Sequence, residues 1–149
     1  MTPMDEAVEA LADRDPARRD DAAEALGDLL RTRGLDQASV RSAVARLVIV
    51  AVEEPMTRVR ESALNAVSKA FNNYRLPLAV VEPLTIALDT MSSELLAHAV
   101  YIFGATQDPR ARPLIEPFLS HRDPSVRNEA ERALTEIPAN GSTDINHNS

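Results

Sequence analysis

The side chains best suited to metal binding or proton transfer in this chain are three scattered histidines, His98, His121 and His147. The chain has no cysteine, so thiolate metal sites, thiol nucleophiles and disulfides are all absent. His98 falls inside a strongly helical segment, where a surface or interhelix residue is a simpler interpretation than a metal ligand. The sequence therefore predicts no metal site and no cofactor.

Other catalytic patterns are equally weak. The four glycines are isolated, so no glycine-rich loop could cradle a phosphate. Serine and aspartate occur mainly where helices are expected to begin, and no Ser-His-Asp arrangement can be argued from their order. We expect no enzyme and no small-molecule substrate.

Charge is concentrated near the N-terminus. The net charge is −7, and the segment 1–30 holds nine acidic residues against three arginines. Nucleic-acid binding is driven by Lys and Arg that displace counterions from phosphates, so a nucleic-acid partner is not expected. A protein partner with a basic surface suits this charge better. The alternative, that these acids only keep an exposed helical surface solvated, stays open.

No apolar run approaches the ~20 residues that a membrane span needs, and the N-terminal stretch carries acids where a signal peptide needs basic residues. We therefore expect a cytoplasmic protein without a membrane partner.

Two stretches at opposite ends of the chain repeat each other. RDPARRDDAAEAL at 14–26 and RDPSVRNEAERAL at 122–134 share Arg, Asp, Pro, Arg, Ala, Ala and Leu, and they lie 108 residues apart, or three steps of 36. Two intermediate copies complete the series, so that Arg19, Arg60, Leu96 and Arg127 are equivalent. The third, sixth and seventh residues after each of these are small or apolar, which places them on one buried helix face.

The segments between these copies supply a second set of helices. Two of them share a Glu-Pro step, at Pro83 and Pro117, where a helix must kink or break. The fold class is therefore all-α, a right-handed α-solenoid of about four antiparallel hairpins. We expect one domain over 1–137, with repeats at about 3–33, 37–73, 77–105 and 109–137. The tail 138–149 has almost nothing apolar, and we expect it to be disordered.

The chain resembles HEAT-repeat proteins, of the bacterial subtype that is also found in phycobilisome-lyase subunits. The resemblance is densest in the last repeat and is carried by the following residues: Gly104, Asp108, Pro109, Arg110, Ala111, Pro113, Leu114, Ile115, Asp123, Pro124, Val126, Arg127, Ala130, Ala133 and Leu134. It implies a superhelix that binds proteins on a concave face lined by the second helices. The His-Glu pairs of HEAT-like hydroxylases and the basic, aromatic groove of HEAT-like DNA glycosylases are absent from the sequence.

If the second helices line the binding face, their exposed stripe falls one, five and eight residues after the repeated Arg position. The candidate partner-binding residues on this stripe are Asp20, Glu24, Glu61, Asn65, Tyr101, Asn128 and Arg132. The stripe should be acidic at its N-terminal end, rich in amides in the middle and mildly basic at its far end. The repeated arginines themselves, Arg19, Arg60 and Arg127, are expected to tie neighbouring repeats together through ion pairs with helix caps.

The leading functional hypothesis is a non-catalytic protein-binding module. A specific form is a bacterial immunity protein or inhibitor that holds a basic toxin against the acidic stripe. One alternative is a lyase-like accessory or maturation factor that acts on a chromophore-bearing or metal-bearing protein. Another is a scaffold subunit of a larger assembly.

Overall fold

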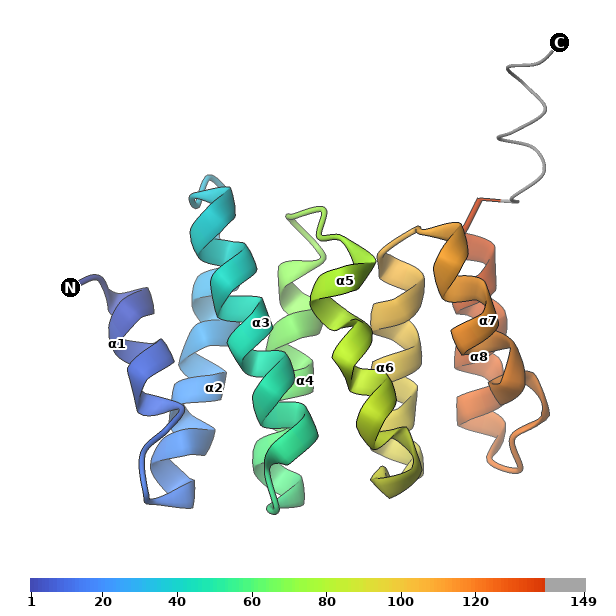
Figure 1. Cartoon of the computed structure of the whole chain (residues 1–149), viewed down its shortest axis with the longest axis horizontal. Helices are drawn as coiled ribbons and strands as arrows, with labels where there is room; N and C mark the ends of the chain where they lie inside the picture. Colours follow the sequence, from blue (N-terminus) through green and yellow to red (C-terminus); the bar gives the residue numbers. More distant parts are fainter. Residues whose placement is uncertain (139–149) are drawn as a thin grey trace, which may run out of the picture.

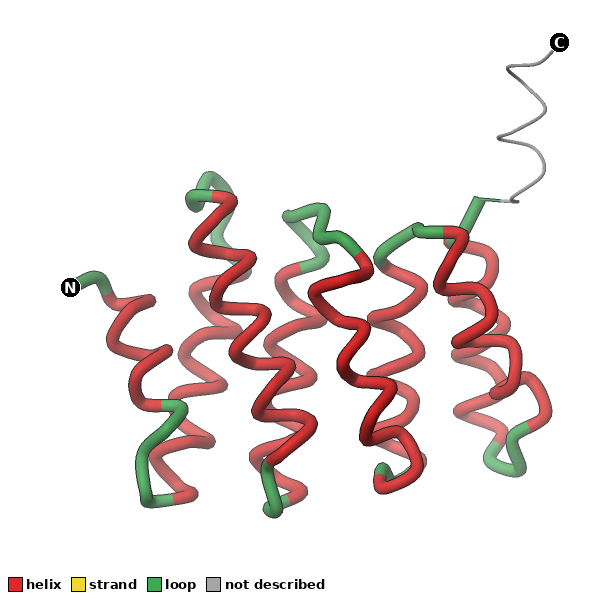
Figure 2. The backbone as a smooth tube through the Cα atoms, viewed as in Figure 1, coloured by secondary structure: helices red, strands yellow, loops and turns green. Residues whose placement is uncertain are grey.

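The protein is a row of helical hairpins in two layers (Figures 1 and 2). The computed structural model describes residues 1–138, and every regular element within that range is a helix. The second layer contains α2 (Pro16–Leu30), α4 (Thr57–Ala70), α6 (Ser93–Ala105) and α8 (Pro124–Glu136). The first layer contains α1 (Pro3–Ala10), α3 (Gln37–Glu53), α5 (Leu78–Val81) with η1 (Glu82–Thr90), and η2 (Pro109–Ala111), α7 (Arg112–Ile115) and η3 (Glu116–Ser120). The two ends of the row lie at opposite ends of the molecule's longest axis.

Each second helix starts three to six positions beyond the end of the first helix of its pair, and three of the four starts have a capping side chain. The side chains of Asp15 and Asp123 accept hydrogen bonds from the backbone N–H groups of Ala17 and Ser125, and each is followed by a proline. Ser92 caps α6 in a similar way. A capping side chain satisfies a donor that the helix leaves unpaired, and proline costs nothing at the first helical position. The repeated Asp-Pro step is therefore a start signal for the second helix.

The Glu-Pro steps interrupt the first layer, as the sequence predicted. The α-helix α5 ends at Val81, and the chain continues as the 3₁₀ helix η1 from Glu82, next to Pro83. The same change occurs at Glu116 and Pro117, where α7 gives way to η3. Proline lacks the N–H that would continue the α-helical ladder, so the tighter 3₁₀ turn takes over.

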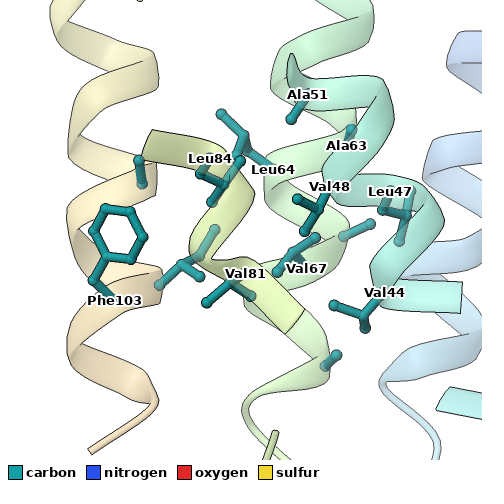
Figure 3. Packing of buried hydrophobic residues seen from close by; sticks show 14 of the residues in the cluster. Val44, Leu47, Val48, Ala51, Ala63, Leu64, Val67, Val81, Leu84 and Phe103 are labelled. Atoms are coloured by element: carbon teal, nitrogen blue, oxygen red, sulfur yellow. The ribbon is translucent and has the colours of Figure 1, made fainter. Parts of the chain in front are cut away.

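One continuous apolar core runs between the layers. Figure 3 shows Val44, Leu47 and Val48 from α3 packed beside Leu64 and Val67 from α4. The core continues through α5, η1 and α6, where Phe103 is fully buried. Each hairpin buries its apolar face against its neighbours, so the stack and not the single hairpin is the folding unit.

Small residues set the spacing of the second helices. A Cβ built on Gly27 would lie 3.3 Å from the Cα of Ala66 in the next second helix. A Cβ on Gly104 would lie 2.6 Å from the Cβ of Ala133. The backbones of α6 and α8 therefore approach so closely that only glycine fits at Gly104.

The loops after the first two second helices are joined by hydrogen bonds. The hydroxyl of Tyr74 donates to the carbonyl of Thr32 and accepts from the N–H of Leu35 at 3.0 Å. The amide of Asn73 donates to the carbonyl of Arg31 at 2.7 Å. These contacts lock the first pair to the second at one edge of the stack.

The all-α solenoid predicted from the sequence is confirmed. The tail, predicted to be disordered, lies outside the described residues apart from Pro138. Among residues 1–138, no helix is long and apolar enough to cross a membrane.

Candidate functional site

The exposed surface of the second helices carries one residue per repeat in a row. Glu24, Asn65, Tyr101 and Arg132 are equivalent positions of α2, α4, α6 and α8, and all four are exposed. Three depressions lie between successive helices of this layer, and together with these four residues they are called the second-helix groove below. The surface is continuous, since Asn65 borders the first two depressions and Tyr101 borders the last two.

The first depression lies between α2 and α4. Glu24 and Asp28 line one wall, and Lys69 lines the other. The Lys69 ammonium lies 3.9 Å from the Asp28 carboxylate, so the cation of this depression already has an acidic neighbour. Glu24 is left as the exposed charge at this end of the groove.

The middle depression has a volume of about 320 Å³ and is larger than its neighbours. Tyr101 and His98 of α6 form its floor with Asn65 and Ser68 of α4. Two carboxylates that the predicted stripe left out, Glu94 and Glu129, also line it. Tyr101 is 38% exposed, and it lines both the middle and the last depressions.

The last depression lies between α6 and α8, and its charge differs from the prediction. Arg132 donates to Glu129 at 3.1 Å, and Glu136 lines the same depression. The expectation of a mildly basic far end was therefore wrong. The reason is that residues one position beyond the expected stripe, such as Glu129, turn toward the preceding helix and also line the groove.

Asp20 corrects a second part of the expected stripe. It is only 6% exposed and lies between α2 and α4, where it accepts a hydrogen bond from Ser62. Arg58 lies 3.3 Å from its other carboxylate oxygen. Asp20 is an interhelix residue, because the close approach of α2 and α4 closes that part of the surface.

The remaining candidates are accessible. Glu61 of α4 is partly buried and Asn128 of α8 is exposed, and neither residue lines one of the three depressions. Five carboxylates line the depressions, and the two cations there, Lys69 and Arg132, are both beside one of them. The five are Glu24, Asp28, Glu94, Glu129 and Glu136. The groove is thus acidic along its whole length.

The described residues contain no group of three or more His, Asp or Glu side chains arranged to hold a metal ion. The groove's chemistry is that of an open, acidic surface with one accessible aromatic ring. Such a surface can bind cationic side chains and backbone amides.

Residues 81–145 match the family model for HEAT repeats. The matched HEAT segment covers the third and fourth hairpins, where the sequence resemblance was densest. No curated protein gives a significant match to the chain. The phycobilisome-lyase subtype stays a prediction.

Solved structures share the fold over nearly the whole chain. A designed armadillo repeat protein in complex with the peptide (KR)4 aligns with a TM-score of 0.67 at 17% identity over 91% of this chain. Two engineered proteins of the Northeast Structural Genomics Consortium align with TM-scores of 0.63 and 0.61, each at 19% identity over 92% of this chain. The alignment spans 64% of the armadillo protein. It spans 63% of the first engineered protein and 38% of the second. The fold is that of the helical repeat solenoids, whose extended surfaces are used for binding proteins.

Two of the three repeated arginines connect neighbouring hairpins, partly as predicted. Arg19 binds the carboxylate of Glu54 in the next repeat, while Arg60 binds the hydroxyl of Thr90 at 3.1 Å and the carbonyl of Ala51 at 2.8 Å. Arg127 bonds to loop carbonyls of its own repeat. The Asp-Pro aspartates, which were expected as partners, instead cap their own helices, because their carboxylates are engaged by backbone N–H groups.

Sequence reasoning missed Glu94, His98 and Glu129 as groove residues. All three lie on the second helices, at offsets that were not counted as exposed. The predicted stripe of exposed residues treats each helix as isolated. In the structure, residues at the edges of the depressions between two helices are accessible as well. Counting the residue after each stripe position would have included His98 and Glu129, whereas Glu94 lies one helical turn before the first stripe position of α6.

Proposed function

We propose that the chain is a non-catalytic, cytoplasmic protein-binding module that holds an extended, basic segment of a partner protein along the second-helix groove. The observation that carries this proposal is the continuous row from Glu24 to Arg132, whose depressions are lined by five carboxylates including Glu24 itself. Because each second helix contributes one equivalent residue to this row, an extended segment that follows the row contacts all three depressions in turn.

The polar composition of the groove supports a peptide-like ligand. Asn65 presents both a donor and an acceptor at the boundary of two depressions, which suits a partner's backbone amide. The Ser68 hydroxyl is buried at the middle depression and has no hydrogen-bond partner within residues 1–138. Tyr101 supplies a rigid aromatic contact of the kind that often dominates interface energy.

The charge of the groove supports a basic ligand. Carboxylates attract Lys and Arg side chains and steer association in a salt-dependent way. The designed armadillo protein of similar fold was solved with the peptide (KR)4, a ligand made only of basic residues. A peptide of this composition is therefore a suitable first probe.

The test is a titration of the chain with an alternating Lys-Arg peptide at several salt concentrations. Replacing Glu24, Glu94 and Glu129 together by Gln should weaken binding about ten-fold and reduce its salt dependence, because each exposed charge contributes roughly 0.5 kcal/mol. A matched variant carries Glu53→Gln, Asp89→Asn and Glu116→Gln, three exposed acids of the first layer. It should bind like the wild type.

Equal losses in both triple variants would show that the peptide responds to net charge alone, and the groove proposal would fail. Absence of binding at low salt would also count against it.

The most specific form of the proposal is an immunity protein or inhibitor that masks a basic toxin. Capture from native cells with the wild type and with the groove variant separates the possibilities. A basic toxin domain recovered only with the wild type, and inhibited by it in equimolar amounts, is the expected result. A chromophore-bearing or metal-bearing protein would favour the accessory-factor alternative, and a large multisubunit complex would favour the scaffold alternative.

A further inference from the structure

Two of the three internal junctions between repeats bring small residues of successive second helices together, and the first junction adds an arginine–carboxylate pair. A small residue of one second helix meets a small residue of the next, as at Gly27 with Ala66 and at Gly104 with Ala133. At the first junction, the fork of Arg19 also holds the carboxylate of Glu54 at 2.7 and 2.9 Å. These contacts define what a neighbouring repeat must supply on each side.

The N-terminal end of the stack has the shape of one half of such a junction. Ala25 is equivalent to Ala66 and Ala133, which receive the glycine of the preceding repeat, yet Ala25 is exposed. It lies in a concavity of about 620 Å³ between α1 and α2. The floor of this concavity is apolar, and Asp13, Asp21 and Asp28 lie at its rim.

Asp13 repeats the local geometry of Glu54. Both residues stand two positions before the N-cap residue of a second helix, and both accept its backbone N–H, at 2.9 Å for Asp13 and 3.2 Å for Glu54. Glu54 uses the same carboxylate to receive Arg19 of the preceding repeat. Asp13 is therefore placed to receive an arginine from the direction of the N-terminal end.

Arg127 supplies the arginine of the opposite half at the C-terminal end, where Thr135 stands at the position of Gly27 and Gly104. Its Nη1 donates to the carbonyls of His121 and Arg122 at 2.8 and 3.0 Å. Arg19 makes the equivalent bonds to the carbonyls of Asp13 and Arg14 at 2.9 and 3.0 Å. Because Nη1 is anchored alike in both, the Nε and Nη2 side of Arg127 corresponds to the side on which Arg19 binds Glu54.

We propose that two copies of this chain associate head to tail, with Arg127 of one copy bound to Asp13 of the next and with α8 docked on the concavity beside Ala25. The contact is heterologous, so further copies can add at either end. The second-helix groove is then continued from copy to copy.

The association is weaker than an internal junction. Where internal repeats bury Val59, Leu95 and Val126, the N-terminal end has the exposed Arg18. Where they bury Ala23, Leu64 and Val100, the C-terminal end has the exposed Glu131. Charged groups at these positions lower the apolar area that the contact can bury, so the assembly depends on concentration and salt.

The test measures the weight-average mass of the full chain by analytical ultracentrifugation from about 10 μM to about 1 mM, a range that detects weak association. The wild type should gain mass with concentration. Asp13→Arg and Arg127→Glu should each stay monomeric, because like charges then meet at every contact. An equimolar mixture of the two variants should associate again, since each contact between unlike copies pairs Arg with Asp or Glu.

A gain-of-function variant keeps the test independent of any folding defect. Lys69 and Asp28 are equivalent positions of adjacent repeats and lie 3.9 Å apart, and Glu136 is the matching residue of the last repeat. Glu136→Lys replaces a repulsion with the next copy's Asp28 by an attraction. It should tighten association on the order of five-fold.

The control is Asp89→Lys, which makes the same charge change on an exposed residue of η1 in the middle of the row and should leave the mass unchanged. A wild type and a Glu136→Lys variant that are both monomeric at about 1 mM would overturn the proposal. So would an association that survives in Asp13→Arg and Arg127→Glu separately.

Discussion

The guanidinium of Arg19 and the carboxylate of Glu54 form a two-pronged ion pair across the first junction of the stack, with Nε–Oε1 and Nη2–Oε2 distances of 2.7 and 2.9 Å. The side chains are 17% and 5% exposed, so the pair is largely shielded from water. The hydrogen bonds from Arg19 hold the pKa of Glu54 below its ordinary value. One residue from each of two hairpins is thereby fixed in position.

Arg19→Ala should destabilise the protein, because it leaves the Glu54 carboxylate, which is only 5% exposed, without its partner. Chemical denaturation monitored by circular dichroism measures this change. Arg18→Ala is the matched control, because Arg18 is exposed and its ion pair with Asp13 is long, at 3.9 Å. This substitution should change the stability by close to zero. Equal effects of the two substitutions would contradict the structural role of Arg19.

Stability should fall in acid through Glu54. Its pKa is lowered in the folded protein, so its stabilising contribution is complete above the ordinary value of 4.5 and is lost as the pH falls through the folded-state pKa. The pKa values of Asp108 and Asp123 are also lowered, by hydrogen bonds from Arg110 and Ser125. Glu54→Gln should therefore be less stable than wild type at neutral pH, and the difference should shrink below pH 4.5 in thermal melts. A constant difference at all pH values would contradict this assignment.

Gly104→Ala should destabilise the protein by about 2–3 kcal/mol, since the new Cβ would overlap both the Cβ and the Cα of Ala133. Gly27→Ala is a useful comparison. There the nearest atoms are 3.3 Å away, and the better helix propensity of alanine offsets the tighter fit. Its unfolding midpoint should stay close to that of the wild type. If Gly104→Ala were equally harmless, the close packing of α6 on α8 would be wrong.

Tyr101→Ala should weaken binding of the Lys-Arg peptide by on the order of ten-fold while leaving the unfolding midpoint nearly unchanged, because the ring faces the groove. Calorimetric titration measures the first effect, and a thermal melt measures the second. Tyr101→Phe should retain most of the affinity if the ring itself makes the contact. A large loss of stability in Tyr101→Ala would instead mark this residue as part of the core.

The sequence predicted the helices well because their signals are local. Asp15-Pro16 and Asp123-Pro124 mark helix starts, and the spacing of small and apolar residues marks the buried face. The candidate site was predicted less well, since exposure depends on how closely two helices approach. Asp20 is buried by α4, and the partner of Arg19 is Glu54, which is far away in sequence and carries no repeat signature.

The two halves of the stack differ in the regularity of their first layer. The N-terminal half has the unbroken helix α3 and the loop contacts of Tyr74, whereas the first layer of the C-terminal half is divided into short α and 3₁₀ segments at Pro83 and Pro117. The hydrogen bonds of a 3₁₀ helix have poorer geometry than those of an α-helix, so a 3₁₀ segment unfolds locally at a lower free energy. If a segment binds along the groove as proposed, we therefore expect the C-terminal half to adjust its curvature to that segment more readily than the N-terminal half.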